Sequence, residues 1–274
     1  MNELFDKIEK AASETVSAEQ EDYTVDGLLH CGKCRTPKQG RYVTPWGVRT
    51  PFCLCKCETE KREIEKAERE RLSRARELRR ECFPEYRMAE WTFANDDRKN
   101  ERVSNIMRNY ADNFETMKKN GKGVLLYGKV GRGKSYIACC VGNALIDRGI
   151  AVLMTDFERI EREANRKFGE RQKYYDELNK YPLLIIDDLG VERNSSYMNS
   201  IVYTVIENRV KAGLPIIVTT NLTSEELKNP AEVENQRIYS RLLGSCIPIE
   251  VDGDDRRREK LKDDWAEFQD ILGY

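Results

Sequence analysis

The chain has 274 residues, enough for one ordinary hydrophobic core and a smaller module, so two folded units are expected. Its formal net charge is −1, so no global basic charge indicates nucleic-acid binding, and such a contact would need a local patch. No apolar run reaches the roughly 20 residues of a membrane helix and no signal peptide is recognisable, so we expect a cytoplasmic protein without a membrane partner.

The first module, residues 1–57, begins with a stretch that predicts a short amphipathic helix. Its apolar residues at helical spacing are Leu4, Phe5, Ile8, Ala11 and Ala12. Further along, five of the nine cysteines crowd into one segment: Cys31, Cys34, Cys53, Cys55 and Cys57. In a reducing cytosol this clustering favours metal ligation over disulfides.

The cysteines form two short motifs, CGKC and CLCKC, separated by eighteen residues. A structural zinc ion needs four thiolates, and two knuckles joined by a loop supply them without a hydrophobic core. One cysteine is spare, because the second pair of ligands is Cys53 with Cys55, Cys55 with Cys57, or Cys53 with Cys57. Redox chemistry is the weaker alternative, since no partner base accompanies the thiols. The adjoining His30 is expected to be an exposed flanking residue, and the remaining cysteines are expected to be packing residues: Cys82, Cys139, Cys140 and Cys246.

Residues 58–83 predict a charged helical linker. A narrow apolar stripe from Ile64 to Cys82 runs among mixed charges, which is typical of a long exposed helix between two modules. Pro84 ends this helix, and residues 84–274 form the second module.

Short apolar runs alternate with helical stretches from Gly123 onward. The runs VLLY, AVLMT, LLIID, IIVTT and IPIEV have the length of strands, and their apolar residues do not alternate with polar ones. Strands buried on both faces have this pattern, so the sequence predicts an α/β fold with a five-stranded parallel sheet flanked by helices.

A phosphate-loop pattern, G-x-x-x-x-G-K-S, lies between a predicted strand and a predicted helix. Its glycines let backbone N–H groups point at phosphates, its lysine reaches the β- and γ-oxygens, and its serine binds Mg²⁺. A glycine turn without a ligand is the alternative, which this strand–turn–helix setting disfavours. The expected nucleotide-binding residues are Gly128, Lys129, Val130, Gly131, Arg132, Gly133, Lys134, Ser135 and Tyr136.

Polar residues end two of the predicted strands. A purely structural strand would avoid Asp187 and Asp188, because unpaired buried charge is costly. Asp187 is the expected Mg²⁺ ligand together with Ser135, and Asp188 is the expected carboxylate that polarises the attacking water. Helix capping by the aspartates is the alternative. Asn221 follows the strand IIVTT and is a candidate to bridge the γ-phosphate and that water, although an asparagine there is usually a turn residue.

Together, the phosphate loop, the aspartate pair, the TTN strand end and the segment RIYSRLLGSC resemble the AAA+ ATPases of the DnaC/DnaI helicase-loader group, which are related to the IstB transposition helpers. The resemblance covers about Phe83 to the C-terminus. By this resemblance Arg241 matches the arginine that reaches a neighbouring subunit's nucleotide, Arg237 is a second candidate, and Asn221 matches the sensor position. The segment that holds Trp91 and Phe93 resembles the one that lies over the adenine.

The sequence departs from the AAA+ pattern at two places. The acidic pair is Asp-Asp where many AAA+ proteins have Asp-Glu, so we expect slow hydrolysis without partners. Some twenty residues follow the run IPIEV, too few for the usual helical lid, so the favoured interpretation of Arg256 to Arg258 is a solvated charge run rather than a sensor arginine.

The segment after the run AVLMT is longer than a plain crossover needs. Its basic residues are Arg159, Arg162, Arg166, Lys167, Arg171 and Lys173. In the initiator and loader group this region resembles an insertion that contacts single-stranded DNA. A solvated amphipathic helix pair is the alternative, because glutamates dilute the basic patch.

The resemblance implies an ATPase that loads a hexameric replicative helicase onto single-stranded DNA and self-associates through the AAA+ interface. The cysteine module resembles that of phage and Gram-positive loaders and is expected to grip the partner. The implied cofactors are ATP, Mg²⁺ and Zn²⁺. An IstB-like ATPase that regulates transposition and a nucleotide-dependent adaptor with negligible turnover are the alternatives.

Overall fold

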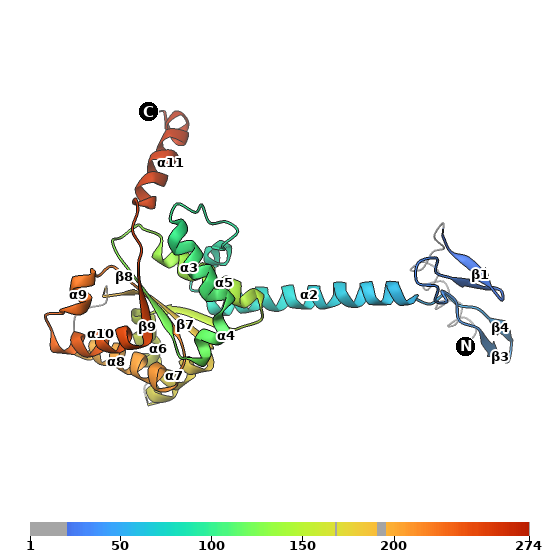
Figure 1. Cartoon of the computed structure of the whole chain (residues 1–274), viewed down its shortest axis with the longest axis horizontal. Helices are drawn as coiled ribbons and strands as arrows, with labels where there is room; N and C mark the ends of the chain where they lie inside the picture. Colours follow the sequence, from blue (N-terminus) through green and yellow to red (C-terminus); the bar gives the residue numbers. More distant parts are fainter. Residues whose placement is uncertain (1–20, 168, 191–195, 274) are drawn as a thin grey trace. The chain divides into compact units, whose positions relative to one another are not determined.

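Figure 1 shows a computed structural model of the chain, which describes residues 21–167, 169–190 and 196–273. The amphipathic helix predicted near the N-terminus lies outside these residues. The chain divides into two compact units, Met1–Leu72 and Ser73–Tyr274, and each is described by itself.

The first unit contains two small antiparallel hairpins. Strands β1 and β2 span Tyr23–Val25 and Leu28–His30, and strands β3 and β4 span Tyr42–Thr44 and Gly47–Arg49. Asp26 and Gly27 turn the first hairpin with φ of 50° and 77°, the left-handed geometry that suits a two-residue turn. Among the described residues of this unit, the buried apolar side chains are those of Cys31 and Cys55. A hydrophobic core therefore contributes little to its fold.

Helix α2, Lys56–Cys82, is the helix predicted between the modules. Exposed ion pairs one turn apart, such as Arg62 with Glu58, add a few tenths of a kcal/mol each. The last turns differ, because Ala75 and Cys82 are buried in the core of the second unit. The boundary between the units consequently falls at Leu72 within the helix rather than at residue 83, and the role of the helix as a spacer stays a prediction.

The second unit is built on a parallel sheet with the strand order β6-β7-β8-β5-β9. The five apolar runs form its strands: β5 Gly123–Tyr127, β6 Val152–Asp156, β7 Leu183–Leu189, β8 Ile216–Thr220 and β9 Cys246–Glu250. Successive residues of a strand face opposite sides, so Ile185 packs in one core and Ile186 in the other. This double burial explains why the runs lack polar alternation.

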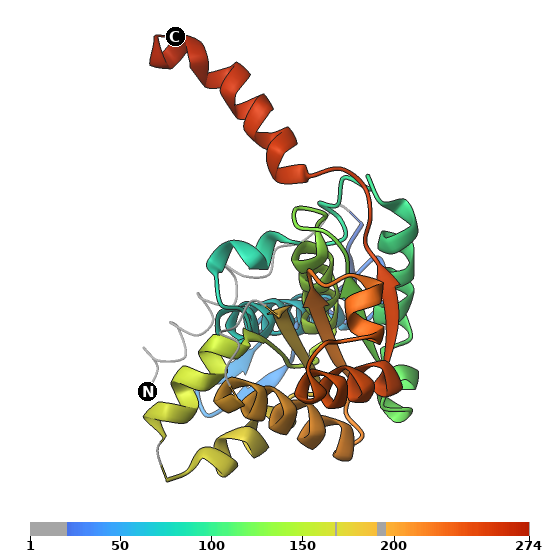
Figure 2. The same cartoon turned by 90° about the vertical axis from the view of Figure 1, so that its left-hand side faces the viewer.

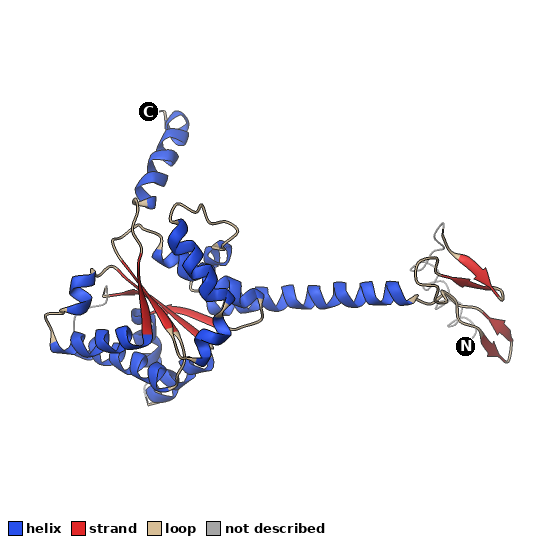
Figure 3. Ribbon diagram, in the orientation of Figure 1, coloured by secondary structure: helices blue, strands red, loops and turns tan. Residues whose placement is uncertain are grey.

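Helices cover both faces of this sheet (Figures 2 and 3). Their bounds are α3 Glu101–Asp112, α4 Phe114–Lys119, α5 Lys134–Asp147, α6 Phe157–Arg166, α7 Arg171–Glu177, α8 Ser196–Lys211, α9 Ser224–Lys228, α10 Val233–Ser245 and α11 Arg256–Leu272, with 3₁₀ turns η1 Tyr86–Glu90 and η2 Leu178–Lys180. Helices α3 and α5 share one core with the sheet, and α6, α8 and α10 share the other. Within the described ranges, no helix has the length and apolar character to span a bilayer.

Strands β5, β8 and β7 are neighbours, so their carboxyl ends meet at one edge of the sheet. Residue 128 follows β5, Thr219 and Thr220 end β8, and Asp187 and Asp188 lie near the end of β7. The fold thereby brings together residues that are up to 92 positions apart in the sequence.

Candidate functional site

The loop between β5 and α5 has the backbone shape of an anion cradle. Gly128, Gly131 and Gly133 have φ of 133°, 81° and 87°, which L side chains rarely adopt. A Cβ atom on Gly128 would also lie 2.6 Å from the backbone oxygen of Val251. Gly133 is the N-cap of α5, so the N–H groups of the first helical turn face this loop. The glycine spacing of the sequence therefore builds an anion site.

Lys134 spans this cradle as the first residue of α5. Its Nζ atom donates hydrogen bonds of 2.8 Å to the backbone oxygens of Gly128 and Lys129. Burial lowers the pKa of the Lys134 ammonium, and the carboxylates of Asp188 and Asp187 oppose this shift. A buried cation with flexible donors is thus held where phosphate oxygens would bind.

The Ser135 hydroxyl donates a hydrogen bond of 2.7 Å to Oδ1 of Asp187, and the Thr219 hydroxyl donates one of 2.5 Å to the same atom. Burial raises the pKa of Asp187, although both hydrogen bonds act in the opposite direction. Hydroxyl and carboxylate oxygens are the ligands that Mg²⁺ prefers. The residues predicted as its ligands are therefore adjacent and chemically suited to it.

Asp188 is exposed and has a left-handed φ of 55°, a conformation that costs a non-glycine residue about 1 kcal/mol. An irregularity in the pairing of β7 with β8 occurs here, and such irregularities re-aim side chains. The Thr219 hydroxyl accepts a hydrogen bond of 2.9 Å from the backbone N–H of Asp188. The Nδ2 atom of Asn221 lies 3.5 Å from Oδ1 of Asp188. Both aspartates lie within β7, so neither caps a described helix. Asp188 and Asn221 face each other at the edge of the cradle.

Trp91 and Phe93 pack beside the cradle. The Trp91 ring lies 5.8 Å from that of Tyr136, whose hydroxyl donates to the Thr92 oxygen at 3.2 Å. The guanidinium of Arg108 lies 4.8 Å from the centre of the Phe93 ring. The predicted adenine segment is thus fixed against α5 and α3.

The segment after β9 crosses the phosphate loop, which the sequence did not indicate. The Arg256 N–H donates to the Gly131 oxygen at 3.0 Å, and the Arg256 guanidinium pairs with Asp97 at 3.2 Å. The side chain of Arg256 is 25% exposed, whereas that of Arg258 is 85% exposed. The interpretation as a solvated charge run is therefore correct for Arg258 and wrong for Arg256. The Asp255 side chain caps α11, so the sequence offered a signal for the start of this helix but none for its contact with the loop.

A family profile described as IstB-like ATP binding protein matches residues 60–263. The chain belongs to this family. The IstB-like ATP-binding domain thus includes the cradle, the aspartates and every strand of the parallel sheet.

Curated relatives of this IstB-like protein include two replicative helicase loaders. DnaI of Bacillus subtilis is 29% identical over 150 residues, which cover 50% of this chain and 48% of DnaI. DnaC of Escherichia coli K12 is 26% identical over 155 residues, which cover 55% of this chain and 61% of DnaC. The similarity to both relatives thus covers about half of this chain and about half to three fifths of theirs.

A solved structure of DnaI superimposes with a TM-score of 0.53 at 23% identity, covering 64% of this chain and 95% of that one. This likeness supports the fold alone. With the five-stranded parallel sheet and the phosphate loop, it confirms the predicted AAA+ P-loop fold of the IstB-like domain.

Arg241 and Arg237 of the IstB-like domain lie on α10 and make their contacts away from the cradle. The Nε atom of Arg241 pairs with Oε2 of Glu207 on α8 at 3.0 Å. Arg237 lines a groove beside α9. The structure therefore does not bring either arginine together with the phosphate loop of its own chain.

Several basic residues of the segment 159–173 pair with nearby carboxylates. Arg166 lies 3.0 Å from Glu163 and Lys167 lies 2.8 Å from Glu177. Arg159 likewise pairs with its own helix cap, Asp156. These ion pairs neutralise much of the predicted basic patch, which favours the solvated helix pair over a dedicated DNA surface.

Four thiols converge in the first unit. The sulfur atoms of Cys31, Cys34, Cys55 and Cys57 all lie within 4.8 Å of one another. The Cys31–Cys57 and Cys55–Cys57 sulfur distances are 3.7 and 3.4 Å, close to the roughly 3.8 Å between thiolates on a tetrahedral zinc ion. Cys53 is exposed and its sulfur faces the Pro37 oxygen, so it lies outside this cluster. The cluster is therefore suited to a metal ion.

Local turns explain this convergence. Arg35 has a left-handed φ of 59°, and the Cys31 N–H donates to the Thr36 oxygen at 2.9 Å, which closes the first knuckle. The Thr36 hydroxyl lies 3.0 Å from the Cys34 sulfur, and this contact together with backbone hydrogen bonds from Cys57 and Thr36 lowers the pKa of that thiol to about 5. His30 instead stacks on Tyr23, outside the cluster. The other four cysteines, Cys82, Cys139, Cys140 and Cys246, are buried as expected.

Proposed function

We propose that this chain is an ATP-driven loader that delivers a hexameric replicative helicase to single-stranded DNA in the cytoplasm. Its similarity to two proteins named replicative helicase loaders supports this function. The observation that carries it is the convergence of a phosphate cradle, a buried lysine and two aspartates at one sheet edge. That arrangement is suited to using ATP as the timing signal for release.

The proposed reaction is the hydrolysis of ATP bound in the loop of residues 128–135. Lys134 would contact the β- and γ-phosphates, and Trp91 and Phe93 would pack near the adenine. Ser135 and Asp187 would hold Mg²⁺, which supplies positive charge to the phosphates when bound. Asp188, oriented by its contact with Asn221, would accept the proton of the attacking water.

Arg241 would act on the nucleotide of a neighbouring copy, with Arg237 as the second candidate. An arginine supplied from another subunit stabilises charge on the transferring phosphoryl group. The position of both residues on α10, away from their own cradle, agrees with such a role and implies self-association.

The cysteine module would bind zinc through Cys31, Cys34, Cys55 and Cys57 and would grip the helicase. Because the unit has few buried apolar residues, metal binding would supply much of its folding free energy.

The proposal is tested by measuring ATP hydrolysis by the full chain alone, with single-stranded DNA, and with a candidate hexameric helicase. Stimulation by the helicase together with DNA, and co-purification with it, are expected. A rate of ATP hydrolysis no higher than the protein-free blank under all three conditions would instead favour a nucleotide-dependent adaptor.

A second candidate is an IstB-like regulator of transposition, which the family description favours. It would respond to duplex DNA and a transposase rather than to single strands and a helicase. The same hydrolysis assay with duplex DNA separates the two.

A further inference from the structure

Helix α11 carries an exposed apolar stripe. Leu261, Trp265, Phe268 and Leu272 follow one another at spacings of four, three and four residues, which places them on one helical face. Leu261 is 66% exposed, Phe268 44% and Leu272 61%. A stripe of this length on a surface helix is typical of a helix that packs against another surface.

The first turn of α11 is fixed to the ATP-binding domain. The Arg256 N–H donates to the oxygen of Gly131 in the phosphate loop, and Nζ of Lys99 lies 2.6 Å from Oε2 of Glu259. From these contacts the helix projects away from α9 and α10 (Figures 1 and 2). Its stripe therefore begins about one turn beyond the contact with the phosphate loop, and Leu261, Phe268 and Leu272 are exposed.

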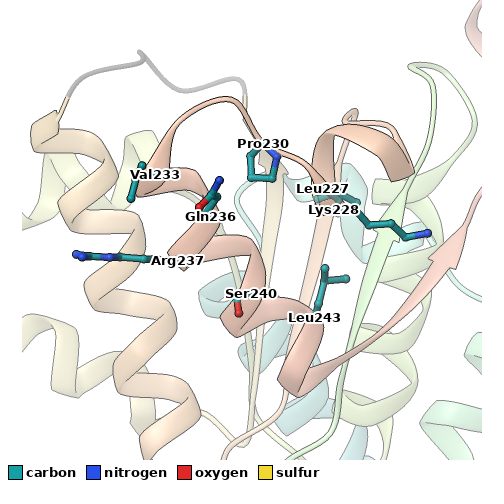
Figure 4. Close-up of a pocket in the computed structure, with 8 residues that line it drawn as sticks. All are labelled: Leu227, Lys228, Pro230, Val233, Gln236, Arg237, Ser240 and Leu243. Atoms are coloured by element: carbon teal, nitrogen blue, oxygen red, sulfur yellow. The ribbon is translucent and has the colours of Figure 1, made fainter.

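A groove of about 640 Å³ lies between α9 and α10 (Figure 4). Its apolar lining consists of Leu227, Pro230, Val233 and Leu243, and Val233 is 64% exposed. Lys228 and Arg237 supply positive charge to the same groove. An apolar floor with a basic rim fits an apolar helix that has acidic flanks.

We propose that the stripe of α11 docks in the α9–α10 groove of a second copy of this chain. Asp264 borders the stripe, and residues 261–272 include four acidic residues and one lysine, so the docking segment complements Lys228 and Arg237 in charge. The contact is head-to-tail, so it builds rings or helical filaments. This inference rests on the proposed function in one respect, which is the composite ATP site formed by the cradle of one copy and an arginine of the next.

The two copies in this contact would contribute different parts of an ATP site. One copy contributes α11, whose first residue contacts its phosphate loop, and the other contributes the groove beside α10, the helix that bears Arg237 and Arg241. Docking therefore brings the arginines of one copy toward the cradle of the next.

The contact is tested by photo-crosslinking. A benzoyl-phenylalanine at Phe268 is irradiated in an equal mixture of ¹⁵N-labelled and unlabelled full-length chains with a non-hydrolysable ATP analogue. We expect mixed-isotope crosslinks to peptides that span residues 227–243. Crosslinks within one chain, crosslinks to other segments, or none would each overturn the proposal.

Light scattering of serine variants provides an independent measurement. The double variant Leu261→Ser with Phe268→Ser should associate at least tenfold more weakly and bind ATP like the parent. The matched control, Lys262→Ser with Gln269→Ser, changes the same two turns off the stripe and should associate normally. Equal association of both variants would contradict the proposal.

The docking of α11 and the role of Arg241 in ATP hydrolysis can be tested separately. If Arg241→Ala crosslinks normally but hydrolyses ATP at the parental rate, the composite ATP site fails while the docking of α11 stands. If crosslinking fails while Arg241→Ala loses turnover, the composite site stands on a different contact.

Discussion

Arg241 on α10 is tethered by Glu207 on α8, with its Nε atom 3.0 Å from Oε2 of the glutamate. The Glu207 side chain is only 10% exposed and also pairs with Lys211 at 3.1 Å. Half of the Arg241 side chain remains exposed, so the guanidinium is oriented by its own chain yet open to a neighbour. A pre-oriented arginine loses less entropy when it reaches a phosphate.

The first prediction concerns this arginine. Arg241→Ala should lower ATP turnover about 100-fold or more in the assembled state, because an arginine finger stabilises transition-state charge, and it should leave ATP affinity unchanged. Mixing Arg241→Ala chains with Lys134→Ala chains should restore part of the hydrolysis, since each supplies what the other lacks. An ordinary surface arginine would change stability by less than about 0.5 kcal/mol and leave the rate alone. In that event Arg237 is the residue to test.

The second prediction concerns the cradle. Lys134→Ala should weaken ATP binding about 100-fold, which corresponds to roughly 2.7 kcal/mol, because it removes the buried ammonium beside the phosphates. The variant should remain folded, since burial disfavours the charged lysine and its loss relieves that cost. Calorimetric titration measures affinity and thermal unfolding measures stability. Unchanged affinity would disprove the phosphate-loop assignment.

The third prediction separates binding from chemistry at Asp188. Asp188→Asn should retain ATP binding and lose turnover, because an amide accepts no proton from water. Asparagine tolerates the left-handed φ of 55°, so the fold should persist. Asp188→Gly should also lose turnover but should unfold no more readily than the parent, whereas Asp188→Val should cost about 1 kcal/mol or more of stability. Parental turnover in Asp188→Asn would assign the base role to another residue.

The fourth prediction concerns the cysteine cluster. Freshly reduced protein should contain about one zinc per chain, and Cys31→Ser should lose the metal and unfold the first unit while ATP binding persists. Cys53→Ser is the matched control and should keep the metal, because the Cys53 sulfur lies outside the cluster. Metal analysis by mass spectrometry checks both variants. Equal loss in both, or a metal-free parent, would count against the site.

Local patterns were sufficient to predict the sheet and the cradle. The unalternating apolar runs predict strands buried on both faces, and the spacing from Gly128 to Ser135 specifies a loop between strand and helix. The end of β7 was predictable for a related reason, since carboxylates such as Asp187 are rare in a buried strand.

Contacts between distant segments were not predictable from these patterns. One cysteine of the second motif lies outside the cluster, and which one depends on how this motif packs against the first. The sequence left three possible ligand pairs open among Cys53, Cys55 and Cys57, because each pair has a spacing that can bind a metal ion. Arg256 touches the phosphate loop because β9 lies next to β5 in the sheet, an order that no local pattern encodes. The packing of the last turns of α2 on α5 likewise depends on the assembled core.

Helix α5 has a different attachment at each end. Its first turn carries Lys134 and Ser135, and near its last turn Asn143 and Asp147 accept hydrogen bonds of 2.7 and 2.6 Å from Arg79 of α2. Its fourteen residues form a rigid rod about 21 Å long. The same helix therefore holds the lysine of the cradle at one end and anchors the last turns of α2 through Arg79 at the other.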